Sequence, residues 1–424
     1  MPLGKWQPFS RCLLSHGKKG YKTAQCCILQ PHRAFSSADS VQTADDDLRR
    51  VEFSQDRIGS DGSLITGTLP GKQEHAAQQE GRARPAALSP TAPVLPPISE
   101  HELQQLVDTI ADSRRLVVLT GAGCSTESSV PDYRGPQGAY STGFKPITHQ
   151  QFMASAEAQK RYWARSFAGW HEFSDIHPNA AHEGLARLQQ RGWVDALITQ
   201  NVDRLHSKAG ATDVIELHGT THRVICMGCG ETSPRQPFQD LLAELNPGAA
   251  DYVQRLIRAG HDAEAARQRS LRVGSTSVEE ARQAQLFKRR PDGDVEIPVR
   301  RPDGDVELQD AGKGFIVPPC PSCGGILKPD VVFFGDGVPA ERSKRVLALA
   351  HECDAMLVVG SSLMVYSAFR LAKAAKTGDG RLAILSAGPT RADAMADLKV
   401  EALAGEALSR IASHPALLIP KTAV

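Results

Sequence analysis

The sequence predicts an α/β protein with a doubly wound parallel sheet and a smaller inserted module that binds zinc. Two observations lead to this fold class: short apolar runs alternate with amphipathic helical patterns, and two Cys-x-x-Cys pairs lie in a middle segment of different character. The chain has 424 residues, of which 41% are hydrophobic, which is ample for a large core. The expected sheet is therefore Rossmann-like.

Continuous apolar runs predict the strands of this sheet. Such runs suit parallel strands that are buried on both faces, and they occur at 116–119, 196–198, 356–359 and 382–385. Apolar residues at helical spacing predict helices over 101–112, 181–190, 340–352 and 362–376. We therefore expect about 98–221 and 331–412 to build the sheet, with the zinc module at about 222–330 between them.

The first 38 residues contain no Asp or Glu but carry several Lys, Arg and Ser residues. This composition is typical of an organelle transit peptide, and 33–37 resembles a mitochondrial cleavage neighbourhood. We expect residues 1–38 to be a mitochondrial transit peptide and the protein to act in the mitochondrial matrix. The alternative is a disordered basic arm.

Residues 39–97 are polar and then rich in Pro, Ala and Gln, so they bury too little apolar surface to offset the entropy of ordering. We interpret them as a disordered linker. The folded domain is expected at 98–412.

The net charge of +1 argues against a chain-wide electrostatic role in nucleic-acid binding. No uncharged apolar stretch of about eighteen residues is present, which argues against a membrane-spanning helix. Neither nucleic acid nor membrane is an expected partner. The sequence leaves the oligomeric state open.

The middle segment carries the candidate metal ligands. Each Cys-x-x-Cys pair is followed by glycine, which permits the sharp turn of a zinc knuckle. Four thiolates leave no open position, so we expect one structural zinc ion rather than a catalytic one. Two disulfides are the less favoured alternative. The ligands are Cys226, Cys229, Cys320 and Cys323.

Part of the 90-residue gap between these pairs resembles an inserted loop, at 251–312. Within it, the sequence RRPDGDVE occurs at 289–296 and again at 300–307. Two copies are too few for a repeat architecture. They are either tandem hairpin strands or a duplicated piece of loop, and we assign no chemistry to them.

The loops after the strands carry polar motifs. The first strand leads into GAGCSTE at 121–127, where glycines let the backbone approach a phosphate. This signal alone is weak, because Thr126 replaces the third glycine of a dinucleotide fingerprint and no acid follows at the ribose position. The departure argues against an ordinary nicotinamide dehydrogenase. PDYR at 131–134, QNVD at 200–203, ELHG at 216–219 and GSSL at 360–363 follow in order.

With the two Cys-x-x-Cys pairs and FFGD at 333–336, these motifs resemble the sirtuins, the NAD-consuming protein deacylases. The resemblance covers about 115–410. The sequence at 161–165, 332–336 and 388–391 is most similar to that of the class II mitochondrial branch.

The resemblance implies NAD as co-substrate, bound by the glycine loop, by the PDYR and QNVD motifs and by loops near the C-terminus. Gln200, Asn201 and Asp203 are expected to hold the nicotinamide carboxamide and ribose, and Tyr133 to cover the reacting ribose. The full set of expected cofactor contacts is Gly121, Ala122, Gly123, Ser125, Thr126, Asp132, Tyr133, Arg134, Gln200, Asn201, Val202, Asp203, Gly360, Ser361, Ser362, Ser386, Ala387, Gly388 and Ala404.

His218 and Asn201 are the expected catalytic residues. A neutral imidazole with a pKa near 6.5 accepts a proton from a ribose hydroxyl at matrix pH. His182 is interpreted instead as a capping and packing residue, and Cys124 as a small filler. Ser129 stands where the family usually has glycine, and strains the turn if a positive φ is needed.

The predicted function is NAD-dependent protein-lysine deacylation, in which the acyl group passes to ADP-ribose and nicotinamide is released. The strand at 331–334 and the stretch 360–365 are expected to clamp the acylated substrate by β-addition. Mono-ADP-ribosyl transfer to protein is the alternative activity. A third possibility is NAD binding without turnover, which the intact His218 and Asn201 argue against.

The acyl group is an open question. Tyr162 and Arg165 lie three residues apart on a predicted helix and resemble a pair that another sirtuin class uses for acidic acyl chains. One hypothesis is therefore a preference for a carboxylated or branched acyl group. The other is that Arg165 is a surface or ion-paired helix residue.

Overall fold

The structure is a computed structural model. It describes residues 95–135, 138, 140, 145–255, 257–258, 301–306 and 312–421. The predicted transit peptide, most of the predicted linker and the first RRPDGDVE copy lie outside the described residues. The domain boundaries therefore stay a prediction.

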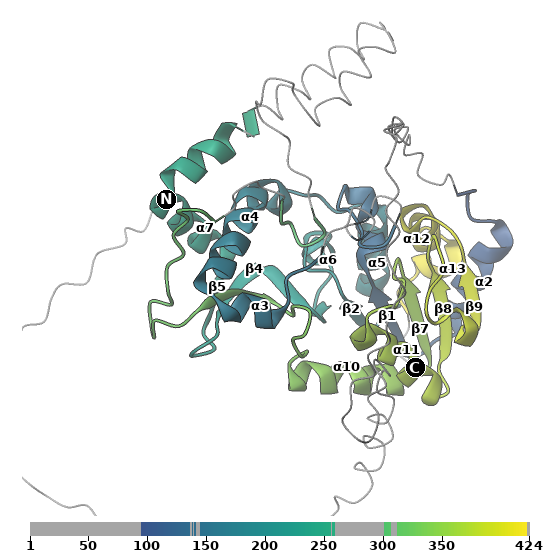
Figure 1. Ribbon diagram of the computed structural model, residues 1–424. Helices are drawn as coiled ribbons and strands as arrows, with labels where there is room; N and C mark the ends of the chain where they lie inside the picture. Colours follow the sequence, from purple (N-terminus) through teal and green to yellow (C-terminus); the bar gives the residue numbers. More distant parts are fainter. Residues whose placement is uncertain are drawn as a thin grey trace, which may run out of the picture. The chain divides into compact units, whose positions relative to one another are not determined.

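Six parallel strands form the main sheet, in the order β3-β2-β1-β7-β8-β9 (Figure 1). The four strands expected from the apolar runs are confirmed as β1 (Leu116–Thr120), β2 (Ala196–Thr199), β7 (Ala355–Val359) and β8 (Arg381–Leu385). The sheet also contains β3 (Ile215–Glu216) and β9 (Leu398–Val400), which are too short to stand out as apolar runs.

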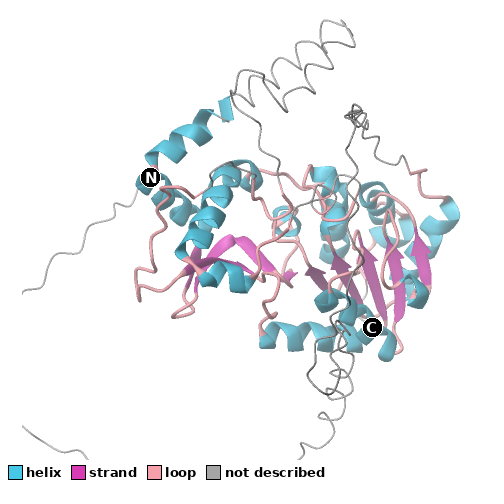
Figure 2. Ribbon diagram, in the orientation of Figure 1, coloured by secondary structure: helices cyan, strands magenta, loops and turns pink. Residues whose placement is uncertain are grey.

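Helices cover both faces of this sheet, as Figure 2 shows, so the doubly wound prediction is correct. On one face α2 (Glu100–Asp112), α5 (Ala180–Gln190) and α12 (Ala404–Ala412) share a core with alternate strand residues such as Leu357. On the other, α10 (Ala340–Glu352) and α11 (Tyr366–Thr377) pack against the next residues along the strands, such as Met356. This winding leaves the carboxyl ends of all six strands at one edge, where ligands of such sheets bind.

A second, antiparallel sheet has the order β5-β4-β6, with β4 at Gly219–Cys226, β5 at Thr232–Pro234 and β6 at Leu327–Val331. It packs with α3 (His149–Ala154), α4 (Ala156–Ser174) and α7 (Arg235–Leu245) around an aromatic core that includes Phe152, Trp163, Phe238 and Phe333. Helices α3 and α4 precede the predicted zinc module in sequence but contribute to its core. We call these elements the small part and the six-stranded sheet with its helices the sheet part.

Short elements complete the described chain: η2 (Ala122–Cys124), η3 (Thr126–Ser128), α6 (Leu205–Lys208), η4 (Asp393–Met395) and α13 (Pro415–Leu418). The helix predicted over 362–376 begins at Tyr366 instead. Leu363 has φ +54, and Ser362, Met364 and Val365 line a cavity, so these residues remain a loop. Within the described ranges, no helix is long and apolar enough to cross a membrane.

The predicted insertion is described only in part. Residues 247–255 are helical, so a helix crosses position 251 where the insertion was expected to begin. In the second RRPDGDVE copy, the described residues 301–306 form a turn. Gly304 of this turn lies so close to α4 that a Cβ on Gly169 would be 2.0 Å from its carbonyl oxygen.

Candidate active site

A cavity of about 980 Å³ lies at the carboxyl edge of the main sheet. All the predicted cofactor contacts line it except Gly121, and so does His218. Strand β6 and the loop after it close its other side, because Val331, Val332, Phe333 and Phe334 also line it. Main-sheet loops and the small part therefore meet at one cavity.

The glycine loop fits tightly against the loop after β7. A Cβ on Gly121 would lie 2.7 Å from Ser361 Cβ, and one on Gly123 would lie 2.8 Å from the Gly360 carbonyl oxygen. The Gly123 amide donates a hydrogen bond to that same carbonyl at 2.8 Å. Glycine is thus required here for the contact between two cavity loops, whatever a ligand adds.

A hydrogen-bonded chain orients the QNVD side chains. Asn201 Nδ2 donates to the Gly121 carbonyl at 3.1 Å and to Ser125 Oγ at 3.0 Å, and Ser125 Oγ donates to Asp203 Oδ2 at 2.8 Å. Asp203 is buried, and burial raises the pKa of its carboxyl group. Gln200 is fixed separately, since its Nε2 donates to Ser361 Oγ at 2.8 Å. The motif is therefore preorganised around the glycine loop.

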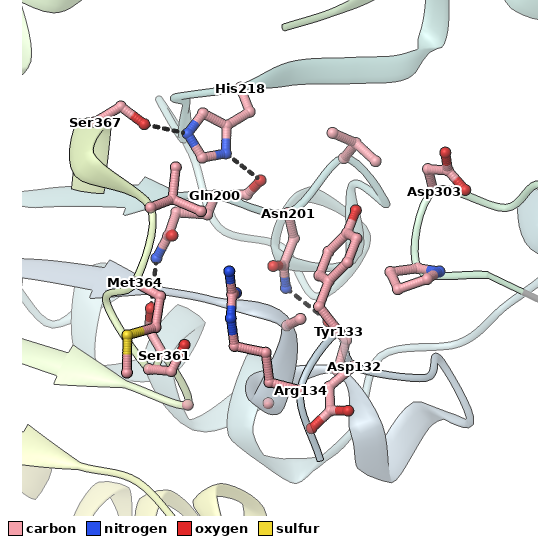
Figure 3. A pocket seen from close by; sticks show the side chains of 18 of the residues that line it. Asp132, Tyr133, Arg134, Gln200, Asn201, His218, Asp303, Ser361, Met364 and Ser367 are labelled. Atoms are coloured by element: carbon pink, nitrogen blue, oxygen red, sulfur yellow. Dashed lines mark hydrogen bonds between the residues drawn. The ribbon is translucent and has the colours of Figure 1, made fainter. Parts of the chain in front are cut away.

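His218 lies in the turn between β3 and β4, and its backbone carbonyl accepts a hydrogen bond of 2.9 Å from Val332 after β6. Its ring makes two contacts, visible in Figure 3: Nδ1 lies 3.2 Å from the Gln200 carbonyl, and Nε2 lies 2.8 Å from Ser367 Oγ. A carbonyl only accepts, so Nδ1 carries the proton and Nε2 presents its lone pair.

Burial lowers the pKa of His218 to about 4, and the Arg342 guanidinium acts in the same direction. The Gln200 hydrogen bond opposes this shift. The sequence-based expectation of a pKa near 6.5 is thus too high, because it assumed a solvated ring. The imidazole is neutral, and able to accept a proton, over the whole physiological pH range.

Sequence reasoning missed three residues that form hydrogen bonds to the site. Ser367 contacts the His218 ring, Glu127 Oε2 accepts a 2.7 Å hydrogen bond from the Gly405 amide at the start of α12, and Lys399 Nζ donates to the Gly388 carbonyl at 2.8 Å. The last two fix cavity loops near the C-terminus. Glu127 belongs to the quoted glycine-loop motif, but nothing in the sequence pairs it with a residue 278 positions away.

The PDYR loop closes one side of the cavity. Asp132 Oδ1 accepts a hydrogen bond from the Gly135 amide at 2.9 Å, which shapes the turn. In Figure 3, the Tyr133 ring stands between Asn201 and Asp303 of the 301–306 turn. Burial raises the pKa of Tyr133, and the nearby Asp303 carboxylate adds to the shift. Asp303 and Pro302 line the cavity although no chemistry was assigned to their segment.

The four predicted zinc ligands come together in the small part. Their sulfur atoms all lie within 4.8 Å of one another, with Cys226 Sγ 3.4 Å from Cys323 Sγ and Cys229 Sγ 3.9 Å from Cys320 Sγ. These separations exceed a disulfide bond, and they approach the roughly 3.8 Å between thiolates around a tetrahedral zinc. Gly230 and Gly324 both have positive φ, as knuckle turns require. The tetrad fits a zinc ion.

Comparison with known proteins agrees with the motifs and their placement. The Sir2 family model matches residues 121–367, more than half of the chain. The chain belongs to the Sir2 family. The sirtuin resemblance drawn from the sequence is therefore confirmed.

Relatives of this Sir2-family chain are similar over most of its length. It is 44% identical to "NAD-dependent protein deacylase SRT2" of Arabidopsis thaliana over 76% of this chain and 79% of that protein. It is 45% identical to an "NAD-dependent protein deacetylase" of Bordetella bronchiseptica, over 74% and 98%. It is 38% identical to "NAD-dependent protein deacylase Sirt4" of Drosophila melanogaster, over 74% and 88%.

A solved structure described as "Structural Basis for the Mechanism and Regulation of Sir2 Enzymes" also matches, with a TM-score of 0.51 and 29% identity. The match covers 74% of this chain and 98% of that one. The fold as well as the sequence therefore places the chain among Sir2 proteins.

Two sequence-based expectations about individual residues can be judged. Ser129, where sirtuins usually have glycine, has φ +62, so the condition under which we expected strain at this turn is met. Arg165 does not line the cavity: its Nε donates to buried Asp305 Oδ2 at 2.9 Å. The ion-paired interpretation of Arg165 is the one the geometry favours, since its charge is neutralised by the 301–306 turn.

Proposed function

We propose that this chain is an NAD-dependent protein-lysine deacylase that transfers the acyl group from lysine to ADP-ribose and releases nicotinamide. The observation that carries the proposal is His218: a neutral imidazole, with Nε2 as its acceptor atom, in the cavity shared by the cofactor loops and the β6 strand end. The similar proteins from Arabidopsis, Bordetella and Drosophila are named as deacylases or deacetylases, which supports the same activity.

In the proposed reaction, NAD supplies the ribose carbon to which the acyl oxygen bonds as nicotinamide leaves. Asn201 and Asp203, held by Ser125, orient the nicotinamide end, and Tyr133 excludes water from the ribose. His218 Nε2 takes a proton from a ribose hydroxyl, and the Gln200 carbonyl stabilises the Nδ1–H that remains. Nicotinamide release is thus assigned to Asn201, Asp203 and Tyr133. Proton abstraction is assigned to His218 with the Gln200 carbonyl.

The proposed protein substrate lies between Val331–Phe334 and Gly360–Val365 as an added strand. Both stretches border the cavity, and Phe334 and Met364 expose 43% and 46% of their surface beside it. A matching structure, with a TM-score of 0.50 and 26% identity, is described as Sir2Tm bound to a propionylated peptide. An extended acyl-lysine peptide is the substrate class that this edge suits.

One structural zinc ion at the cysteine tetrad and a location in the mitochondrial matrix complete the proposal. The tetrad geometry supports the zinc. The acid-free first 38 residues support mitochondrial import, and the Drosophila relative is named Sirt4, the branch that the motifs resemble. Mono-ADP-ribosyl transfer remains the alternative activity, since it uses the same activated ribose with a different acceptor.

The test uses the full zinc-loaded chain with NAD and a panel of acyl-lysine peptides. Wild type should release nicotinamide and free-lysine peptide in equal amounts. His218→Ala should lower kcat/KM at least about 100-fold, because a general base contributes about that much or more. His351→Ala, on exposed α10 surface, is the matched control and should leave the rate within about twofold. An unchanged rate in His218→Ala contradicts the proposal, and ADP-ribose on protein without free-lysine peptide makes the chain a transferase.

The same assay gives a pH profile. Since the imidazole accepts the proton, activity falls as pH drops through the His218 pKa. The acid limb of kcat/KM should lie near pH 4, the pKa of the buried ring, rather than near 6.5. A midpoint at 6.5 that disappears in His218→Ala would show that the ring is solvated in the working enzyme.

A further inference from the structure

A second cluster of metal-ligating side chains lies under the cofactor loop, apart from the cysteine tetrad. Cys124 ends η2 in the glycine loop, His182 lies in the first turn of α5, and His206 lies in α6. Their exposed fractions are 0%, 0% and 1%. One ligand atom from each lies within 4.8 Å of the others, and the two imidazole centroids are 4.7 Å apart. Three separate segments thus converge on one buried point.

The hydrogen bonds of this cluster leave one polar atom unsatisfied. His206 Nε2 lies 2.9 Å from Thr120 Oγ1, but its Nδ1 is buried and has no hydrogen-bond partner among the described residues. Such a nitrogen in a buried position calls for a specific partner. His182 Nδ1 accepts a hydrogen bond from the Asn179 amide at 3.2 Å, so the predicted capping role of His182 at the start of α5 is present. Its Nε2 has only a long contact of 3.3 Å, to Ser125 Oγ. Both rings therefore have capacity for a further ligand.

The chemistry of the three groups matches zinc. Both imidazoles are buried, and a neutral imidazole is the form that binds a metal ion. Burial raises the pKa of the Cys124 thiol, so zinc has to displace the thiol proton when it binds. A thiolate with two imidazoles is a borderline-soft set that zinc accepts, with Zn–S near 2.3 Å and Zn–N near 2.0–2.1 Å. Tetrahedral ligands at those lengths lie roughly 3.3–3.6 Å apart, so each of two atoms now within 4.8 Å of one another needs to move by about 1 Å or less.

We propose that Cys124, His182 and His206 form a second zinc site, weaker than the cysteine tetrad, and that zinc bound there opposes NAD binding. The fourth position is open to water or to Ser125 Oγ. The site is weaker because it has one thiolate in place of four. Two groups offset the two positive charges of the ion: the Cys124 thiolate and the Asp203 carboxylate. The carboxylate accepts a hydrogen bond from Ser125 Oγ at 2.8 Å.

The coupling to NAD comes from Ser125, which follows Cys124 in the chain. Its hydroxyl contacts His182 Nε2, Asn201 Nδ2 and Asp203 Oδ2, so it joins the cluster to the residues proposed to hold nicotinamide. A metal on His182 replaces the first of these contacts, and a metal on Cys124 pulls on the loop that carries Gly121 and Gly123. Zinc and NAD should therefore compete through this loop.

The existence of the second zinc site is tested without an activity assay. Full-length protein, wild type, Cys124→Ala or Cys353→Ala, is loaded with cadmium-113 and examined by NMR, and bound zinc is counted after dialysis. Cys353 is the matched control because it is an equally buried free cysteine of the sheet part. Wild type and Cys353→Ala should show a four-thiolate resonance and a second, upfield resonance from one thiolate with nitrogen ligands. Cys124→Ala should lose only the second resonance and one zinc per chain.

Thermal unfolding of each variant verifies that it is folded, and His206→Gln supplies an independent loss of ligand if Cys124→Ala does not fold. One zinc in wild type, or a second zinc that persists in both Cys124→Ala and His206→Gln, overturns the site.

The proposed effect on NAD binding rests on the proposed cofactor site. It is measured as NAD affinity by equilibrium dialysis, not as activity. Zinc beyond the first equivalent should weaken NAD binding at least about fivefold in wild type and Cys353→Ala but not in Cys124→Ala. Equal weakening in all three overturns the coupling.

Discussion

The two parts of the folded chain are held together in different ways. In the sheet part, aliphatic side chains fill both faces of six parallel strands, and many of them are completely buried. The small part has three short strands and an aromatic core, but it also buries Arg235, Lys328 and Asp305, and it carries the cysteine tetrad. A small layer cannot bury enough apolar surface, so we expect it to depend on metal, ion pairs and stacked rings.

The guanidinium of Arg235 illustrates the difference. It lies against the rings of Trp163, Trp170 and Phe238, at 4.9 to 5.7 Å from their centroids, and burial lowers its pKa to about 9. The sheet part has no comparable buried guanidinium among the described residues. The small part therefore buries charge as part of its core, and its stability should depend on polar interactions far more than that of the sheet part.

The largest effect should come from removing one tetrad ligand. Cys320→Ser should abolish metal binding at the cysteine tetrad and unfold the small part, because structural zinc contributes on the order of 10 kcal/mol to such modules. Activity should be lost, and the signals of Trp163 and Trp170 should change, whereas Trp193 in the sheet part stays in its folded environment. Metal analysis measures the loss of the ion, and near-ultraviolet circular dichroism measures the loss of packing. Comparing the fluorescence of the chain with and without Trp193→Phe separates the signal of Trp193 from those of Trp163 and Trp170. Cys353→Ser is the control, and a Cys320→Ser chain that keeps its activity would remove the contrast between the parts.

An intermediate effect is expected at the buried ion pair that ties the 301–306 turn to α4. Asp305→Ala leaves Arg165 partly buried and unpaired, so it should lower the free energy of unfolding by about 3–5 kcal/mol. Arg165→Met should cost less, because Asp305 keeps Arg301 as a partner at 3.5 Å. The double variant should lose less than the two single losses added together, as urea denaturation of all four proteins would show.

The same Arg165→Met variant tests the acyl hypothesis. Because Arg165 is neutralised and lies outside the cavity lining, the ratio of acidic-acyl to acetyl turnover should stay unchanged. A selective loss of acidic-acyl turnover would mean that the arginine leaves Asp305 and reaches the substrate.

The smallest effect is expected in the sheet part. Ser129 has φ +62 in the turn before the PDYR loop, a conformation that costs a non-glycine residue about 1 kcal/mol. Ser129→Gly should therefore raise the free energy of unfolding by up to about 1 kcal/mol. A loss of stability would show that the side chain of Ser129, rather than its backbone, matters for this turn. Ser128→Gly, in the preceding 3-10 helix, is the control and should not stabilise the chain.

Much of the sheet part could be read from the sequence, because buried parallel strands leave continuous apolar runs such as 116–119 and 356–359. The short β3 and β9 leave none. The start of α11 was placed four residues too early, because 362–365 has apolar and small residues but forms a cavity loop around Leu363. The α3–α4 contribution to the small part was also missed, since helical spacing shows which face is buried but not against what.

The sequence by itself determined the family, the cysteine tetrad and the motif residues that line the cavity, because these depend on residue types in fixed local motifs. Only the tertiary structure decided what those residues experience. Burial lowers the His218 pKa to about 4, Asp305 neutralises Arg165, and Cys124 meets two histidines from distant segments. Each of these three effects depends on side chains from distant segments that contact the residue and exclude water from it. Local sequence patterns do not show which segments come together.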